Sequence, residues 1–212
     1  MQKVICVDHP LVKHKLSLLR DRNTVHWEFA QVLTELTVLL AVEATRTLRL
    51  RRDRVETPLE AAQVEKLDEG VVLVPILRAG LGMVEGFKRI FPLARVGFVG
   101  LFRDEETLQP QHYYTSLPER LDGDAVFVLD PMLATGGSVV YALNLLRKSG
   151  VDPVTVVSVI SAPEGISFVH GKYPEVTIVT AAVDRCLNDR GYILPGLGDA
   201  GDRIFGTLAE EA

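Results

Sequence analysis

Hydrophobic residues change their spacing near residue 70 of the chain. Before that point they recur at helical intervals: Pro10 opens a predicted helix that runs to about Arg20, and a longer helix follows, with Thr24 as its expected cap. We expect Trp27, near the start of the longer helix, to lie in the core; the alternative is a subunit contact. The apolar positions that predict the longer helix are Val25, Phe29, Val32, Leu33, Leu36, Leu39 and Leu40.

After residue 70, short runs rich in β-branched residues alternate with longer stretches of helical character. Such runs are typical of strands that are buried on both faces. The alternation predicts an α/β fold: a doubly wound, mostly parallel sheet of about five strands with helices on both faces. The predicted strands are 71–76, 94–99, 125–129, 154–160 and 176–182, and the predicted helices are 80–91, 136–149 and about 164–172.

Length and composition narrow the class of protein. A chain of 212 residues is long enough to bury one large core, and no repeat or low-complexity segment divides it. We therefore expect a single domain over residues 1–212, in which 1–69 supply helices and an arm, 70–185 form the core sheet and 186–212 form a C-terminal loop.

The formal net charge of −5 gives no global attraction for nucleic acid, so any polyanion site has to be local. Two cysteines form neither a disulfide scaffold nor a zinc ribbon, and their number fits a cytoplasmic protein. No apolar run approaches the roughly 20 residues of a membrane span, and no metal-ligand spacing is visible. Five arginines within residues 46–54 permit nucleic-acid binding, but interspersed acidic residues favour a solvated arm or an oligomer rim.

Three unusual segments directly follow three predicted strands: 77–80, 102–106 and 130–138. Because ligands of parallel α/β sheets bind at the carboxyl ends of strands, we expect the three segments to meet on one rim. The polar stretch 103–118 is long for a connection, which favours a lid or binding loop over plain surface loop.

The segment 130–138 has the composition of a phosphate-binding loop. Its glycines let the backbone approach a phosphate, the N–H groups of a helix start point toward it, and Thr135 and Ser138 add hydroxyl donors. Asp130 is an acceptor when ionised and suits the vicinal hydroxyls of a sugar. The alternative interpretation is an ordinary turn before a capped helix, which has the same composition. A nucleoside triphosphatase is disfavoured, because the phosphate-binding loop of that class has a lysine before the serine and no lysine precedes Ser138.

Two other segments invite a nucleotide interpretation. Arg78 can donate two hydrogen bonds to phosphate oxygens beside a helix that starts at Gly80. The alternative is that Arg78 forms a salt bridge that caps a helix. Residues 196–201 match the dinucleotide fingerprint G-x-G-x-x-G, but only eleven residues follow them, so no βαβ unit can form there. A dinucleotide site is therefore the weaker interpretation.

Longer strings around these segments carry a resemblance to a known family. Residues 128–138 resemble the phosphoribosyl diphosphate signature of type I phosphoribosyltransferases. The strings VPILRAGLGM, FRDEETLQP, DPMLATGGS and GYILPGLGDAGDRIFGT are similar to segments of the uracil phosphoribosyltransferases, and the likeness covers essentially the whole chain. Pro131 stands where the broad superfamily has a second acidic residue, so ribose binding would rest mainly on Asp130.

The resemblance implies transfer of a phosphoribosyl group to uracil, which gives UMP and diphosphate, on a type I phosphoribosyltransferase fold with a C-terminal base-binding hood. It implies that Arg78, Arg103, Asp130 and Asp199 are catalytic. The implied contacts of phosphoribosyl diphosphate are Arg78, Ala79, Gly80, Arg103, Asp130, Pro131, Met132, Leu133, Ala134, Thr135, Gly136, Gly137, Ser138 and Asp199. The implied contacts of uracil are Tyr192, Ile193, Gly198, Asp199 and Ala200.

The resemblance also implies a cofactor and partners. Mg²⁺ would be carried mainly by the diphosphate donor and water, without a dedicated set of protein ligands. GTP is a possible effector, and a homodimer or higher homo-oligomer is expected. Two other function classes stay open: a regulator of pyrimidine genes that binds RNA through residues 46–54, and a nucleotide-binding oxidoreductase.

Overall fold

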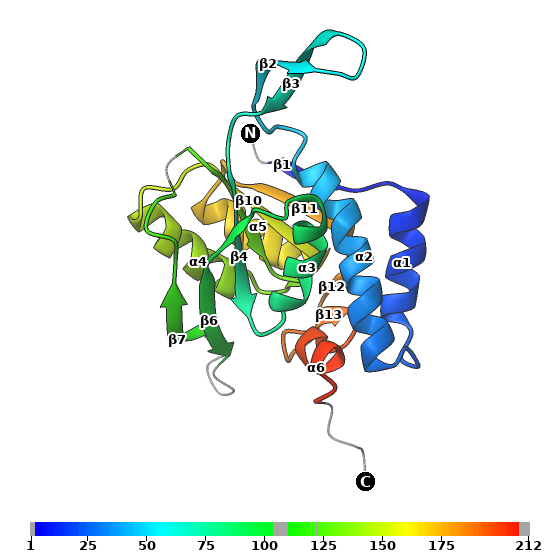
Figure 1. Cartoon of the computed structure of the whole chain (residues 1–212). Coiled ribbons are helices and arrows are strands. Elements are labelled where there is room, and N and C mark those ends of the chain that lie inside the picture. The colour runs from blue at the N-terminus through cyan, green and yellow to red at the C-terminus, as the bar shows by residue number, and fades with distance from the viewer. Residues whose placement is uncertain (1–2, 104–109, 122, 208–212) are drawn as a thin grey trace.

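A mostly parallel sheet lies between two layers of helices in the computed structural model (Figure 1). The structure describes residues 3–103, 110–121 and 123–207, and of Arg103 and Pro110 it describes the backbone alone. The strands of this sheet are β1 (Lys3–Cys6), β4 (Val71–Leu77), β5 (Arg95–Val96), β6 (Phe98–Arg103), β7 (Pro110–Ser116), β8 (Ala125–Leu129), β9 (Met132–Leu133), β10 (Val154–Ser161) and β11 (Thr177–Val183).

The strand order is β1-β11-β10-β8-β4-β6-β7, with β5 beside β4 and β9 beside β10. Every pair except β6 and β7 is parallel, as in the register of Val72 with Val126. The expected α/β class is confirmed, and each predicted strand has a counterpart. The number of strands was wrong: the described residues form nine, because edge strands and two-residue pairings need no continuous apolar run.

The additional edge strand β7 corrects the interpretation of 103–118 as one long loop. Residues 110–116 pair antiparallel with β6, and most of their side chains are exposed. A strand with polar residues on both faces gives no hydrophobic alternation, so the sequence pattern did not predict it. The intervening residues 104–109 lie outside the described residues.

Helices cover both faces of the sheet and separate two apolar cores. One core joins α1, α2, α3 and α6 to the sheet, and the other joins α4 and α5 to its opposite face. Neighbouring residues of β4 alternate between the two, with Leu73 in the first core and Val74 in the second. No helix in the described part of the chain is long and apolar enough to cross a membrane. The helices are α1 (Pro10–Arg20), α2 (His26–Ala44), α3 (Leu81–Ile90), α4 (Gly137–Lys148), α5 (Pro163–Lys172) and α6 (Ala200–Phe205).

Two details at the start of α2 differ from the sequence prediction. The Thr24 hydroxyl donates to the carbonyl of Leu18 at 2.6 Å and does not cap the helix, whose preceding residue is Val25. Trp27 is 62% exposed and is not a core residue. The reason is helical geometry, because Phe29, Val32 and Leu33 occupy the face of α2 that packs on the core.

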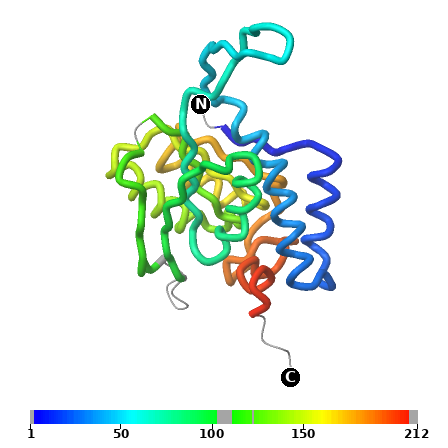
Figure 2. Tube along the Cα trace, in the orientation of Figure 1, coloured from blue at the N-terminus to red at the C-terminus, as the bar shows by residue number. Residues whose placement is uncertain are grey.

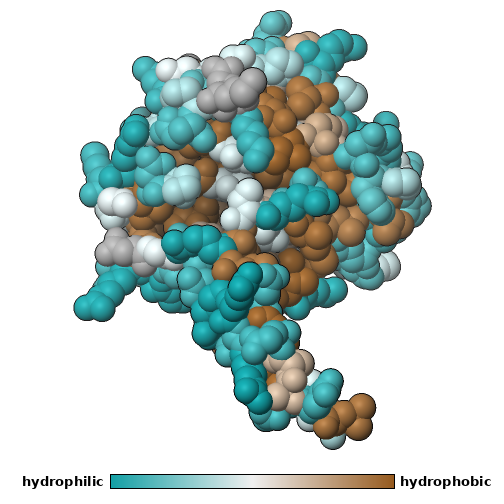
Figure 3. Space-filling model, turned by 90° about the horizontal axis from the view of Figure 1, so that it is seen from above, coloured by the Kyte–Doolittle hydropathy of each residue, from teal (hydrophilic) through white to brown (hydrophobic). Residues whose placement is uncertain are grey.

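The arginine-rich segment forms an arm. Strands β2 (Leu50–Glu56) and β3 (Ala61–Leu67) pair antiparallel and project from the body of the molecule (Figures 1 and 3). Figure 3 shows mostly hydrophilic residues along the arm and hydrophobic atoms at its tip, where Leu59 is 96% exposed. Arg51 pairs with Asp53 and Asp68, and Arg54 pairs with Glu56. These ion pairs reduce the positive charge that the cluster presents.

Candidate active site

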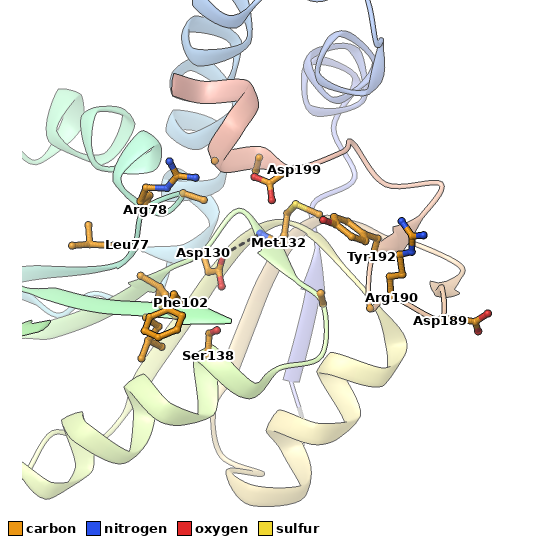
Figure 4. Close-up of a pocket in the computed structure, with 17 residues that line it drawn as sticks. Leu77, Arg78, Phe102, Asp130, Met132, Ser138, Asp189, Arg190, Tyr192 and Asp199 are labelled. Atoms are coloured by element: carbon orange, nitrogen blue, oxygen red, sulfur yellow. Dashed lines mark hydrogen bonds between the residues drawn. The ribbon is translucent and has the colours of Figure 1, made fainter. Parts of the chain in front are cut away.

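A cavity of about 960 Å³ opens at the carboxyl ends of the central strands, next to the C-terminal segment. Arg78, Asp130 and Asp199 come from three different elements and surround its centre (Figure 4). The rim predicted from the sequence is thus a real concavity. Its lining residues are Ile76, Leu77, Arg78, Ala79, Leu101, Phe102, Asp130, Met132, Ala134, Ser138, Asp189, Arg190, Gly191, Tyr192, Asp199, Ala200 and Gly201.

Arg78 supplies a cation at the end of β4. Its Nη2 atom donates to Oδ1 of Asp202, on α6, at 3.0 Å, and 59% of the Arg78 side chain is exposed. The capping salt bridge considered from the sequence therefore exists, but it joins Arg78 to a distant helix. An exposed pair of this kind is worth at most about 1 kcal/mol, so an anionic ligand can compete for the guanidinium.

Gly80 packs the end of β4 against β8 and does not line the cavity. An added Cβ atom would lie 2.3 Å from the carbonyl oxygen of Leu129, so no side chain fits there. The Gly80 N–H group donates to the carbonyl of Ile76 at 2.9 Å. Ala79, in contrast, lies on the cavity wall.

The segment after β8 leads from an acidic side chain into a helix start. Oδ1 of Asp130 accepts from the N–H of Met132 at 3.3 Å, drawn as a dashed line in Figure 4. Helix α4 follows Gly136, and no side-chain hydrogen bond caps it within the described residues. The first N–H groups of a helix lack partners within the helix, so this uncapped end suits an anion better than the ordinary capped turn does.

The C-terminal segment closes the cavity from the other side. Asp199 caps α6, since its Oδ1 accepts from the N–H of Asp202 at 3.0 Å. Asp199 and Ala200 line the cavity, together with Tyr192, which is 45% exposed. Ile193 is buried in the first apolar core.

The other implied contacts divide into three groups. Leu133, Thr135 and Gly136 line a small adjoining cavity that shares Asp130 and Ser138 with the large one. Neither cavity wall includes Gly80, Pro131, Gly137, Ile193 or Gly198. The backbone of Arg103 ends β6, and its side chain lies outside the described residues.

Three of the lining residues carried no signal in the sequence: Phe102, Asp189 and Arg190. Phe102 belongs to a segment that we had singled out, but no signal marked its ring as part of the site. Asp189 and Arg190 lie between two short strands, β12 (Cys186–Leu187) and β13 (Ile193–Leu194), where charged residues usually mark only a solvated turn. In Figure 4 the Asp189 carboxylate points away from the centre of the cavity.

The segment 196–201 has no dinucleotide-binding geometry. Strands β12 and β13 before it form an antiparallel pair, and α6 after it has six residues. The phosphate-binding turn of a dinucleotide site instead joins a strand to a helix within a βαβ unit. The glycines here shape the loop beside the cavity.

The carboxylates of the site fit a metal ion that is bound mainly by the phosphates of a ligand. Within the described residues no group of three or more His, Cys, Asp or Glu side chains could hold an ion. Asp130 and Asp199 are single carboxylates on opposite sides of the cavity. Mg²⁺ keeps several waters and needs only one or two carboxylates when phosphates bind it, so this donor set is adequate for it.

Comparison with known proteins identifies the family. The family model described as uracil phosphoribosyltransferase matches residues 6–207. A uracil phosphoribosyltransferase of Dictyoglomus thermophilum is 54% identical over 205 residues, which cover 96% of this chain and 99% of the relative.

Solved structures share the fold of this chain. A protein from Aquifex aeolicus superposes with a TM-score of 0.93 at 42% identity, over 97% of this chain and 99% of the other. An adenine phosphoribosyltransferase from Trypanosoma brucei shares the fold, with a TM-score of 0.56 at 12% identity over 90% of this chain and 88% of the other. The chain therefore belongs to the uracil phosphoribosyltransferase family.

Proposed function

We propose that the chain transfers the phosphoribosyl group of 5-phospho-α-D-ribose 1-diphosphate to uracil, giving UMP and diphosphate. Family membership makes it a glycosyltransferase of the pentosyltransferase class. The observation that carries the proposal is the cavity in which an uncapped helix start, a cation and the C-terminal loop face one another. A ligand with a phosphate at one end and a diphosphate at the other matches this arrangement.

Residues 130–138 would hold the 5-phosphate and the ribose. The N–H groups at the start of α4 and the hydroxyls of Thr135 and Ser138 are the donors for the phosphate. Asp130 would accept from the ribose hydroxyls at the mouth of the same loop. The buried residues among them would shape the loop through their backbone; they are Pro131, Leu133, Ala134 and Gly136.

Arg78 would bind the diphosphate, with Ala79 contributing main-chain groups and Arg103 acting from the end of β6. Arg78 lines the cavity, and within the described residues its guanidinium pairs with Asp202 across an exposed contact. If a diphosphate replaces the Asp202 carboxylate, the Arg78 guanidinium stays paired with an anion and can donate two parallel hydrogen bonds to it. Gly80 would act mainly by letting β4 approach β8.

The uracil would lie beside Tyr192, Ile193, Gly198, Asp199 and Ala200. Main-chain groups of a loop present fixed donors and acceptors, so they distinguish uracil from cytosine, whose ring nitrogen and amino group reverse two of three positions. Asp199 lines the cavity. It would lie between the base and the donor and face both.

The reaction breaks the bond between the anomeric carbon and the diphosphate oxygen and forms a bond from that carbon to a uracil ring nitrogen, which loses its proton. The chain's residues bind and orient the two substrates, and Arg78 and Arg103 stabilise the charge that develops on the leaving group. Mg²⁺, held mainly through donor oxygens and water, supplies further charge neutralisation when bound.

The remaining parts of the proposal concern partners and location. We expect a homodimer or higher homo-oligomer, as the family resemblance implies. GTP is proposed as an effector from the family resemblance, and the cytoplasm is proposed as the location from the low number of cysteines. Light scattering tests the assembly, and initial rates with and without GTP at subsaturating donor test the effector.

The proposed activity is tested by incubating the protein with labelled uracil, phosphoribosyl diphosphate and Mg²⁺ and measuring UMP and diphosphate. We expect equal amounts of the two products, and none when either substrate is left out. Absence of UMP from a folded preparation at saturating substrates would contradict the proposal.

A further inference from the structure

Two arginines outside the cavity hold residues 196–200, the part of the C-terminal segment on which the proposed base site depends. The loop, residues 196–200, lies at the end of the molecule where α1, α2 and α6 come together (Figure 2). Resting on the proposed function, we propose that Arg20 and Arg203 are positioning residues for uracil: they fix the backbone of this loop and touch no substrate.

Arg20 acts together with Asp184. The Asp184 side chain is 4% exposed, and its two oxygens accept from Arg20 at 2.9 and 2.5 Å. Arg20 also donates to the carbonyl of Gly196 at 2.8 Å, and the Gly196 N–H donates to Asp184 at 2.9 Å. Both backbone polar groups of Gly196 are therefore hydrogen-bonded to one ion pair, whose carboxylate is buried.

Arg203 holds the next residue of the loop. It is 8% exposed and donates to the carbonyl of Leu197 at 2.8 Å. The same guanidinium donates to the carbonyls of Leu19 and of Asp21, the latter at 2.6 Å, and lies 4.3 Å from the ring centroid of Phe29. One side chain thus ties the loop to α1, to the turn after α1 and to α2.

The chemistry of this contact requires arginine. Burial lowers the pKa of the Arg203 guanidinium, an effect that the charge of Asp21 partly offsets, but the pKa of an arginine lies so far above neutrality that the group stays charged at neutral pH. Its rigid fork of N–H donors reaches several carbonyl oxygens at once, whereas a lysine has one compact ammonium group. A lysine at either position cannot reproduce the set of contacts.

These contacts bear on uracil more than on the donor. Gly196 and Leu197 immediately precede Gly198, Asp199 and Ala200, the main-chain groups assigned to the base. The contacts described for the two arginine side chains include no residue of the segments 77–80 or 130–138. A loop that shifts by about 1 Å can cost a reaction roughly 100-fold, because the base then misses its reactive position.

The test uses Arg203→Lys in the full chain, with Arg147→Lys as the matched control. Arg147 also stacks on an aromatic ring, that of Tyr173, but it lies on α4, away from the loop. We expect Arg203→Lys to raise the KM for uracil roughly 10- to 100-fold while the donor Kd, measured by calorimetry with Mg²⁺, stays within about twofold. The control should change neither constant.

A second readout separates this proposal from the proposed function. Hydrogen exchange should become faster at residues 196–200 in Arg203→Lys and remain unchanged in β4 and β8. If the wild type makes no UMP, the proposed function fails, and the exchange rates still test the positioning role. Asp184→Asn, which removes the charge opposite Arg20, should give the same pattern and serves if Arg203→Lys does not fold.

Either of two results would overturn the inference. One is unchanged exchange in the loop together with an unchanged KM for uracil. The other is a donor Kd that weakens as much as the KM for uracil rises, because that result means a general loss of structure.

Discussion

Gly80→Ala offers the sharpest test of how the site is built, because the structure separates steric cost from backbone strain. Gly80 has φ −59° and ψ −23°, a conformation that alanine adopts freely. The added Cβ atom, however, would lie 2.3 Å from the carbonyl oxygen of Leu129 and 2.7 Å from the nitrogen and oxygen of Ile76. These are backbone atoms of β8 and β4, so no side chain can move aside.

The expected loss of stability follows from these contacts. Overpacking a tight site typically costs about 1–3 kcal/mol, and three rigid contacts place Gly80→Ala near the upper end. Alanine also restricts the unfolded chain, which returns about 0.4–1 kcal/mol. We expect a net destabilisation of about 2 kcal/mol, together with loss of activity because Arg78 lies two residues away.

Gly171→Ala is the matched control, since Gly171 lies in α5 and an added Cβ atom there meets nothing within 4 Å. It should be neutral or more stable than the wild type by up to about 1 kcal/mol. Urea unfolding at one fixed protomer concentration measures both variants, because association would otherwise shift the apparent stability. Equal stability of the two variants would refute the claim that β4 and β8 approach too closely for a side chain.

Three further outcomes are expected. Asp130→Asn and Arg78→Ala should each lower kcat/KM for UMP formation, by an amount that corresponds to a loss of about 2–4 kcal/mol in transition-state stabilisation, without changing the urea midpoint. Near-normal turnover of both variants would contradict their assignment as catalytic residues. The hydrogen bond from Lys15, with a smaller one from Gln31, lowers the pKa of Glu35 below its ordinary 4.5, so the pair stabilises the fold above that pH and this stabilisation disappears as pH falls through the lowered value. Glu35→Gln should therefore destabilise at pH 7 by at most about 1 kcal/mol and match the wild type in acid, and a loss that persists in acid would contradict the ion-pair explanation. Cutting the arm at Leu59, which is 96% exposed, should leave the urea midpoint of the body unchanged, because the arm's own strands pair with each other; a lower midpoint would show that the arm supports the core.

The sequence was most informative where burial is continuous. Strands β4, β8 and β10 are buried on both faces, and their apolar runs predict them within a residue or two. The polar strand β7 gave no such signal, since both of its faces are largely exposed. The prediction that Trp27 lies in the core was wrong because an aromatic residue within a helical pattern does not by itself indicate which face of the helix it occupies.

For the site, the sequence identified segments but not their mutual contacts. The loop after β8 and the cation after β4 could be located because parallel strands end on one rim. The pairing of Arg78 with Asp202 and the burial of Arg203 depend on how α6 folds back over α1 and α2. Contacts over such distances along the chain leave no local pattern, and a charged residue is ordinarily expected at the surface.

The central claim is tested most directly by a competition in one reaction. Wild-type protein is mixed with Mg²⁺, phosphoribosyl diphosphate and equal concentrations of uracil, cytosine and hypoxanthine, and the nucleotides are counted by mass spectrometry at early times. A main-chain pocket that pairs with uracil leaves polar groups unpaired against cytosine, so UMP should exceed CMP and IMP by at least about 1,000-fold. Comparable amounts of CMP or IMP would contradict the assignment of the C-terminal loop to uracil, even if phosphoribosyl transfer itself occurs.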